Sequence, residues 1–298
     1  MSEVLTLRAG NLEAGVAPDI GGALTHFRRA DGVDLMRAAD TTALADGNVL
    51  GVACFPLVPY SGRIAGGRLN FAGRRYALPI NAPPDPNALH GDGWQCPWQV
   101  DHADAGEVRM TLPDPGRGWP WAYSARQAYR LAEEGLTVTL SVTNESAEPM
   151  PAGLGIHPWF DATPDATLQF RAGSVFRVDA GYLFTGVTPI PDEWDFTAAR
   201  PVSGTGLVNG FAEWTGVAEI VWPARQAALR IEAEPPLTHL VVYTPPGQNF
   251  FCVEPVSHSV DAFNLHAAGS AAGNGTAILG PGETLTGSAR FLVGVPPR

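Results

Sequence analysis

Apolar and polar residues alternate along many short stretches of the chain. The clearest case is the segment 136–143, in which every second residue is apolar and which a polar turn follows at 144–146. Strict alternation is typical of a β-strand with one buried face. Residues 68–78 indicate a hairpin that turns at 72–74. Further strands are predicted near residues 3–8, 22–28, 167–171, 217–222, 227–232, 238–243, 250–254 and 285–295.

Turn-forming residues are spread through the whole chain. The 298 residues include 34 glycines and 27 prolines, and few windows show a helical period. Many short strands between turn signals predict a β-sandwich or barrel, whereas doubly wound and TIM-barrel folds need long helices between strands. No linker-like stretch divides the sequence. We therefore expect an all-β, antiparallel β-sandwich that forms one domain over residues 1–298.

The charge balance limits the classes of partner. The chain has 19 basic and 30 acidic residues, a net charge of −11, and every basic residue is arginine. This argues against nucleic acid and anionic membrane surfaces as partners. The lack of lysine excludes Schiff-base chemistry and the Walker lysine. No stretch is long and apolar enough to span a bilayer and no signal-peptide pattern is present, so a cytoplasmic location is expected.

Cysteine and histidine spacings indicate no metal centre. Cys54, Cys96 and Cys252 form no C-x-x-C motif, and the first and last lie in apolar runs. They are predicted to be reduced thiols of the core. The seven histidines include no H-E-x-x-H motif, and the chain has no G-x-S-x-G elbow. We expect neither a metal nor a cofactor.

Polar groups collect in four segments that a simple sandwich core would not need. They contain Arg63 among glycines, His90 before a glycine, His157 within an apolar run, and Glu254 at the end of another. Each has a structural alternative: a surface arginine, a loop histidine, a core histidine and a strand-end glutamate. Apolar surroundings should lower the pKa of His157 and raise that of Glu254, which suits proton transfer. Trp159 could offer a flat face to the C–H side of a sugar ring.

Taken in order, these segments resemble the aldose 1-epimerase (galactose mutarotase) family. The matching blocks run over residues 62–68, 78–81, 89–91, 155–160 and 243–255, and the resemblance extends from about residue 15 to 295. It implies a large β-sandwich with a sugar cleft on one sheet. It also implies a cofactor-independent isomerase that interconverts the α and β anomers of a free aldose.

The resemblance assigns roles by position. It implies that Glu254 is the general base, His157 the general acid, His90 a second histidine near the ring oxygen, and Arg63 a substrate-binding residue. We expect the functional atoms of Glu254 and His157 to lie a sugar ring apart in one cleft.

One position departs from the family pattern. The family usually places a sugar-binding aspartate three residues before a phenylalanine, and here Val208 stands there. Asn209 is expected to make part of the missing contact.

Two other functions remain open at this stage. A relative that acts on a hexose 6-phosphate would need an arginine cluster, for which Arg68, Arg74 and Arg75 are candidates. A non-catalytic sugar-binding protein would need no acid–base pair. The expected partner is a small-molecule sugar, and the chain is expected to be a monomer or homodimer.

Overall fold

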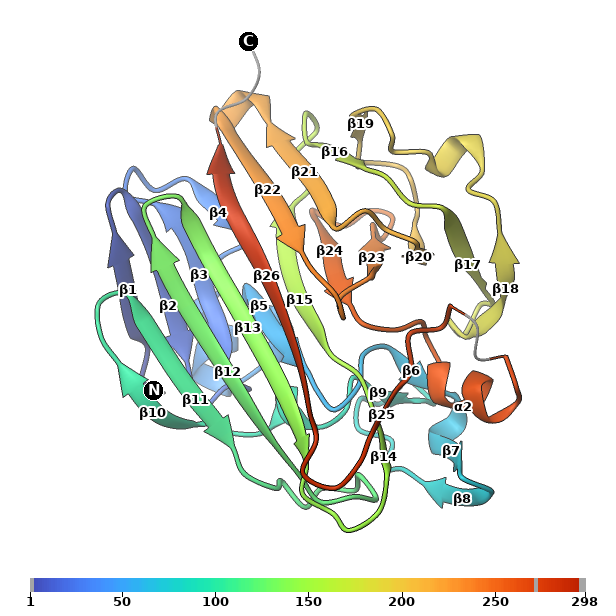
Figure 1. The fold of residues 1–298 in the computed structure, drawn as a ribbon. Coiled ribbons are helices and arrows are strands. Elements are labelled where there is room, and N and C mark those ends of the chain that lie inside the picture. Colours follow the sequence, from blue (N-terminus) through green and yellow to red (C-terminus); the bar gives the residue numbers. More distant parts are fainter. Residues whose placement is uncertain (1–2, 271–272, 295–298) are drawn as a thin grey trace.

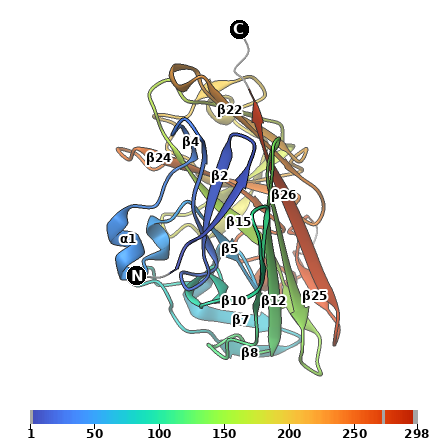
Figure 2. The ribbon, with the colours of Figure 1, turned by 90° about the vertical axis from the view of Figure 1, so that its left-hand side faces the viewer.

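Two large antiparallel sheets pack face to face in the computed structural model, which describes residues 3–270 and 273–294 (Figures 1 and 2). Within these residues, one sheet has eleven strands and the other nine. The predicted all-β sandwich is confirmed.

The eleven-stranded sheet contains, in spatial order, β1 (Leu5–Ala9), β2 (Leu12–Ala17), β3 (Ala23–Arg29), β5 (Cys54–Leu57), β15 (Gly155–Asp161), β24 (Phe250–Val256), β23 (His239–Tyr243), β20 (Val208–Ala212), β17 (Ser174–Val178) and β18 (Phe184–Thr188), with β4 (Asp34–Met36) paired to β3. The nine-stranded sheet contains β10 (Gln99–Ala103), β11 (Glu107–Leu112), β12 (Tyr123–Ala132), β13 (Gly135–Asn144), β26 (Thr284–Gly294), β22 (Ala227–Ala233), β21 (Val217–Trp222), β16 (Thr167–Phe170) and β19 (Arg200–Pro201).

Small elements connect the sheets. Three strand pairs lie outside them: β6 (Arg63–Ile64) with β9 (Ala88–Leu89), β7 (Arg68–Phe71) with β8 (Arg74–Ala77), and β14 (Met150–Ala152) with β25 (Ala277–Leu279). The helices are α1 (Thr41–Asp46) and α2 (Ala262–Ala267), with short 3₁₀ turns η1 (Val49–Gly51), η2 (Ala65–Gly67), η3 (Gly93–Gln95), η4 (Asp192–Trp194) and η5 (Pro223–Arg225). No helix of the described residues is long and apolar enough to cross a membrane.

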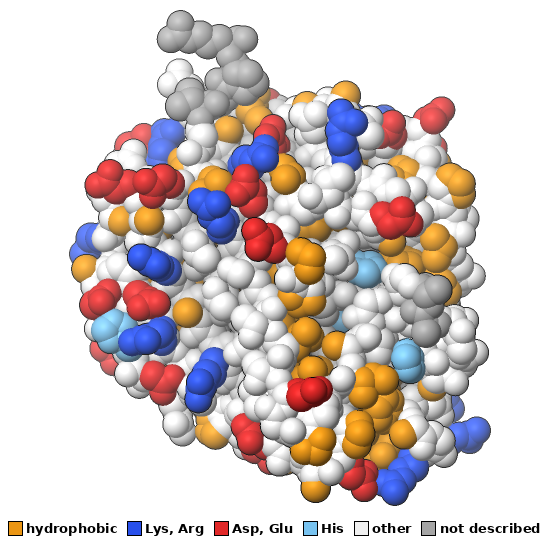
Figure 3. Space-filling model, viewed as in Figure 1, with side chains coloured by type: hydrophobic (Ala, Val, Ile, Leu, Met, Phe, Trp, Pro, Cys, Tyr) orange, Lys and Arg blue, Asp and Glu red, His pale blue; other side chains and the backbone are white. Residues whose placement is uncertain are grey.

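Side-chain alternation gives the nine-stranded sheet one apolar face. Along β13 every second residue from Leu136 to Val142 is buried, and these side chains join a core that both sheets line. The outer face carries charges of both signs (Figure 3), including ion pairs from Arg230 to Glu219 and Glu232. This sheet therefore has one face in the core and one face in water.

The eleven-stranded sheet is covered on both faces at its centre. Six of the seven residues of β15 and six of those of β24 are buried, with no alternation. One set of side chains, such as Ile156 and Val253, enters the inter-sheet core, and the next set, such as Trp159 and Val256, packs in a second cluster on the outer face. That outer cluster, beneath the connecting loops, is where a site can form.

The strands predicted from the sequence are confirmed, as is the hairpin of β7 and β8. Residue 295, at the end of the predicted strand 285–295, lies outside the described residues. Sequence reasoning missed β12, although it pairs with β13 over ten residues, because Gln127 interrupts its apolar alternation. Gln127 is buried, and its amide donates to the Tyr129 hydroxyl.

The core face of β13 gives a test of the fold. Leu140→Ala should lower the free energy of unfolding by about 2–5 kcal/mol, because Leu140 is fully buried between the sheets and its truncation leaves a cavity. Urea unfolding followed by tryptophan fluorescence measures the change. The matched variant Thr139→Ala, on the opposite face, should change the value much less; equal effects would contradict the assigned face.

Candidate active site

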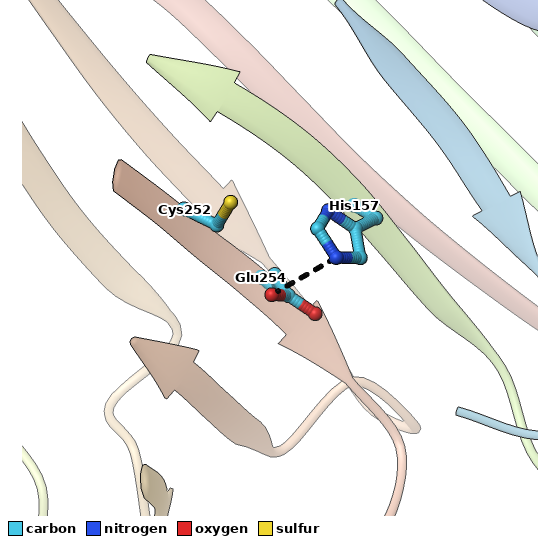
Figure 4. A group of neighbouring side chains, drawn as sticks. All are labelled: His157, Cys252 and Glu254. Carbon is cyan, nitrogen blue, oxygen red and sulfur yellow. Dashed lines mark ion pairs between the residues drawn. The ribbon is translucent and has the colours of Figure 1, made fainter. Parts of the chain in front are cut away.

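Strand register brings His157 and Glu254 together. β15 and β24 are antiparallel, with Gly155 opposite Val256 and Trp159 opposite Cys252, so His157 lies directly across from Glu254. Both side chains leave the outer face of the sheet, and His157 Nε2 lies 3.3 Å from Glu254 Oε1 (Figure 4). Two residues 97 positions apart in sequence thus form one buried pair.

Aromatic side chains hold the ring of His157. Phe55 lies opposite His157 on β5, and the two rings stack with centroids 4.4 Å apart. The Trp159 ring also stacks on His157, at 5.2 Å, and the guanidinium of Arg37 lies 4.3 Å from the Trp159 ring centroid. These contacts leave the ring edge, with Nε2, directed at Glu254.

A loop places His90 beside the pair. Its ring meets that of His157 edge-on, with centroids 5.4 Å apart. The backbone N–H of Gly62 donates to His90 Nδ1, which leaves the proton of the neutral ring on Nε2. His90 has a left-handed backbone (φ 59°), and a Cβ at Gly91 would approach the Val58 carbonyl oxygen to 2.3 Å. The backbone therefore requires glycine at position 91, whereas His90 takes a conformation that residues other than glycine rarely adopt.

Asn81 and Asp85 position the loop groups. The Asn81 amide donates to the carbonyls of Leu89 and Gly91, and its oxygen accepts the N–H of Leu89. Asp85 pairs with Arg63 at 2.7 Å, and the Arg63 guanidinium lies over the Tyr182 ring. From the sequence, Asn81 is noted only as part of the block 78–81, and Asp85 is not recognised as a site residue. Their hydrogen-bond partners depend on how the loop folds, which the sequence does not show.

A cavity of about 300 Å³ lies on the outer face of the eleven-stranded sheet. Arg63, His90, His157 and Glu254 all line it, so the four chemical segments of the sequence converge as predicted. Trp159 also lines it. Its ring packs on His157 and beneath Arg37, so it supports His157 instead of offering the open platform expected from the sequence.

Burial determines the protonation state of the His157–Glu254 pair. It raises the pKa of Glu254 to about 8, with a small opposing effect of the Arg63 charge, and it lowers the pKa of His157 to about 3. From about pH 3 to pH 8 the pair therefore holds one proton and no net charge. Burial, and then the neighbouring His157, also lowers the pKa of His90 far below its ordinary value.

Comparisons with known proteins identify the family of the chain. A sequence model of the family described as aldose 1-epimerase matches residues 3–292. The chain belongs to the aldose 1-epimerase family.

Two curated relatives from Escherichia coli K12 are similar to the chain. The uncharacterized protein YphB is 34% identical over 292 residues, covering 95% of this chain and 96% of its own. The uncharacterized protein YihR is 30% identical over 222 residues, covering 70% of each. The names of these two relatives state no activity. The two matches therefore support the family assignment and do not identify a substrate.

Solved structures have the same fold. One from Escherichia coli K12 is 31% identical and superposes with a TM-score of 0.89, covering 99% of each chain. A galactose mutarotase-like protein from Clostridium acetobutylicum is 19% identical with a TM-score of 0.85, covering 98% of this chain and 95% of its own. At that identity the second comparison supports the fold alone.

The structure corrects the prediction for Asn209. Alternation along β20 directs Val208 and Gly210 into the cavity and Asn209 to the other face, where its amide donates to the Phe176 carbonyl oxygen at 2.8 Å. The prediction that Asn209 contacts the sugar is therefore wrong. The position at which the aldose 1-epimerase family usually has an aspartate is an apolar part of the cavity lining.

The three arginines considered for a sugar phosphate lie away from the cavity. Arg68, Arg74 and Arg75 lie on the β7–β8 hairpin and do not line the cavity. Arg74 pairs with Glu148 at 3.1 Å and borders a separate surface hollow beside Trp121. The sequence alone does not show whether the arginines of a hairpin lie near a site formed by distant residues. The fold shows that this hairpin and the cavity are separate.

The sequence did not identify two buried histidines, His239 and His258, as cavity residues. Their neighbours in the sequence do not distinguish a histidine of a site from a histidine of the core. His258 accepts from the Ser61 N–H through Nε2 and donates through Nδ1 to the Ser259 carbonyl. His239 lies between Thr238 and the Gly273 carbonyl. Both line the cavity, but their ring nitrogens are already engaged.

The thiols are buried, as predicted. Cys252 has a further feature: its Sγ, His157 Nε2 and a Glu254 oxygen all lie within 4.8 Å of one another (Figure 4). These are donor types that zinc takes in proteins. Among the described residues this is the one such group of three, and a metal there would occupy both members of the His157–Glu254 pair. The absence of a metal therefore stays a prediction.

The raised pKa of Glu254 predicts a pH dependence of stability. The folded chain keeps a proton that the unfolded chain releases above about pH 4.5, so this stabilisation is lost as pH rises through about 8. His157 acts in the opposite sense, but only between about pH 3 and 6.5. From pH 6.5 to 8 the free energy of unfolding should fall by up to about 1.4 kcal/mol per pH unit.

Urea titrations at several pH values test this. Glu254→Gln should remove the decline, whereas the exposed Glu234→Gln should preserve it. Parallel curves for wild type and Glu254→Gln between pH 6.5 and 8 would show that Glu254 is ionised throughout this range.

Proposed function

We propose that this member of the aldose 1-epimerase family interconverts the α and β anomers of a free aldose by opening and closing the sugar ring. The observation that carries the proposal is the buried His157–Glu254 pair, 3.3 Å apart, at the floor of a sugar-sized cavity. Both side chains are almost fully buried, and an unpaired charge is unfavourable in such a buried position. Such a pair is easier to explain by proton transfer than by support of the fold.

The reaction needs two proton transfers at neighbouring oxygens. Glu254 accepts the proton of the anomeric hydroxyl O1 while His157 donates a proton to the ring oxygen O5. The C1–O5 bond breaks, O1 becomes the aldehyde oxygen, and the C1–C2 bond rotates. O5 then attacks the other face of C1, returns its proton to His157, and Glu254 returns a proton to O1. Atoms and charge balance, and the pair ends with the proton it began with.

The short distance within the pair suits this step. The two groups are expected a sugar ring apart, and they lie closer than that, at 3.3 Å. The physical reason is that O1 and O5 are bonded to the same carbon. An acid and a base that serve both oxygens must therefore lie side by side, not on opposite sides of the ring.

Burial places the resting proton on Glu254 and leaves His157 neutral. The roles above need that proton on His157, to which it can pass along the direct contact as the sugar enters. The Nε2–H of His90 adds a donor beside the pair, and the Arg63 guanidinium, held by Asp85, adds a positive charge in the same cavity. Both favour the negative charge that develops on oxygen as the ring opens.

The other two functions have less support. The arginines considered for a sugar phosphate lie outside the cavity, and among the described residues Arg63 is the one arginine that lines it. A protein that only binds sugar has no need of an acid and a base in contact. Free-aldose epimerisation accounts both for the absence of these arginines from the cavity and for the contact between an acid and a base.

Removal of the carboxylic acid tests the proposal directly. Glu254→Gln keeps the shape and loses the titratable group, so the rate of anomer exchange should fall by about 10²–10⁴-fold. Polarimetry of freshly dissolved single anomers measures the rate, and circular dichroism checks the fold. Glu234→Gln, on the surface, should retain full activity. Wild-type rates for Glu254→Gln would make Glu254 a structural strand residue.

The pH profile gives a second test. Above about pH 8 the pair loses its single proton, so no acid remains for O5, and kcat/KM should fall about tenfold per pH unit. Exchange rates from NMR, corrected for the uncatalysed reaction at each pH, measure this limb. A flat kcat/KM between pH 7 and 9.5 would contradict a catalytic role for the pair's proton.

A further inference from the structure

The cavity floor is a regular grid of side chains from adjacent antiparallel strands. Starting at His157 on β15, the register leads to Glu254 on β24, Val241 on β23 and Gly210 on β20. A second row of side chains lies two residues farther along each strand, and it includes Tyr243 on β23 and its partner Val208 on β20. With strands about 4.8 Å apart, Val241 lies about 5 Å and Gly210 about 10 Å beyond the strand of Glu254.

The grid leaves room on one side of the pair only. Toward β5 the Phe55 ring stacks on His157, and the Trp159 ring, two residues along β15, stacks on it as well, so aromatic rings occupy this part of the floor. Toward β20, Gly210 has no side chain, and a Cβ there would lie 3.3 Å from the Phe176 ring and 3.9 Å from Val241. A sugar with its anomeric carbon over His157 and Glu254 therefore extends across β23 and β20.

This open side is apolar. The cavity residues from β17, β20 and β23 are Phe176, Val178, Val208, Gly210, His239, Val241 and Tyr243. Five of these seven side chains have no hydrogen-bonding group. Both ring nitrogens of His239 are engaged by Thr238 and Gly273, which leaves the Tyr243 hydroxyl. Next to these strands the cavity is also lined by Tyr182, under the Arg63 guanidinium, and other groups that can bind oxygen lie around His90, His157 and Glu254.

We propose that the substrate is a deoxyaldose, a sugar that lacks a hydroxyl on the part that faces Val208 and Val241. The proposal rests on the epimerase function above and specifies its substrate class. A fully hydroxylated sugar would press a hydroxyl against two valines and lose a hydrogen bond to water without replacement. A deoxy position places a methylene or methyl group there and buries apolar surface on both sides.

Matched sugar pairs test the proposal. Anomer-resolved NMR exchange would give kcat/KM for D-glucose, D-galactose and D-mannose, each beside its 6-deoxy form, and for 2-, 3- and 4-deoxyglucose. At least one deoxy sugar should exceed its parent by about 10- to 100-fold, the range over which an apolar pocket discriminates against an added hydroxyl. The position that gives the gain identifies the carbon that faces the valines.

Three outcomes decide the matter. A deoxy preference of tenfold or more supports the proposal. Catalysed exchange in which every parent sugar equals or exceeds its deoxy forms overturns the deoxyaldose assignment and leaves the epimerase function standing. Exchange of none of these sugars, with the enzyme folded, overturns the epimerase function and this inference with it.

A nearly isosteric variant then tests the wall itself. Val208→Thr adds one hydroxyl with little change of shape, so the deoxy-to-parent ratio should fall at least fivefold. Val241→Thr makes the same change one strand closer to Glu254 and serves if Val208→Thr does not fold. Val187→Thr, on the exposed side of β18 and outside the cavity, is the matched control and should leave the ratio unchanged. An unchanged ratio in both cavity variants would overturn the role of this wall.

Discussion

The register between β15 and β24 is the constraint on which the site depends. Because these antiparallel strands place His157 directly opposite Glu254, two groups from distant parts of the chain meet at 3.3 Å without any loop to position them. A shift of either strand by one residue would turn its side chain of the pair into the inter-sheet core and remove the site. Ile156 and Val253, which precede the two residues and pack in that core, oppose such a shift.

Burial gives this contact its chemistry. The loops that cover the outer face of the eleven-stranded sheet exclude water from the pair, which raises one pKa, lowers the other and leaves a single shared proton over a wide pH range. The same loops provide His90 and Arg63, each oriented by a further residue: Gly62 for His90 and Asp85 for Arg63. The site is thus a rigid sheet floor with loop walls, an arrangement common in binding proteins.

The floor is also asymmetric along the row of strands. Aromatic rings occupy one side of the pair, and valines with a glycine form the other. This asymmetry fixes the direction in which a sugar extends and the type of surface it meets. The substrate class that we infer follows from the same register that positions the His157–Glu254 pair, because Val241 and Gly210 continue the row of His157 and Glu254.

The sequence by itself determined the fold class and indicated the ionisable groups of the candidate site. Alternation along residues 136–143 marks a half-buried strand whatever surrounds it, and His157 and Glu254 are conspicuous because ionisable groups are rare inside apolar runs. Alternation failed for β12, where the buried Gln127 donates its amide N–H to the Tyr129 hydroxyl.

Only the tertiary structure decided which groups meet and which way each side chain points. It directed Val208 into the cavity and Asn209 away from it, since the face of a residue on a strand depends on the register with its neighbours. It likewise separated the arginines of the hairpin from the site and added Asp85, His239 and His258. Proximity between residues far apart in the chain comes from packing of the whole sandwich, and the order of residues alone does not contain it.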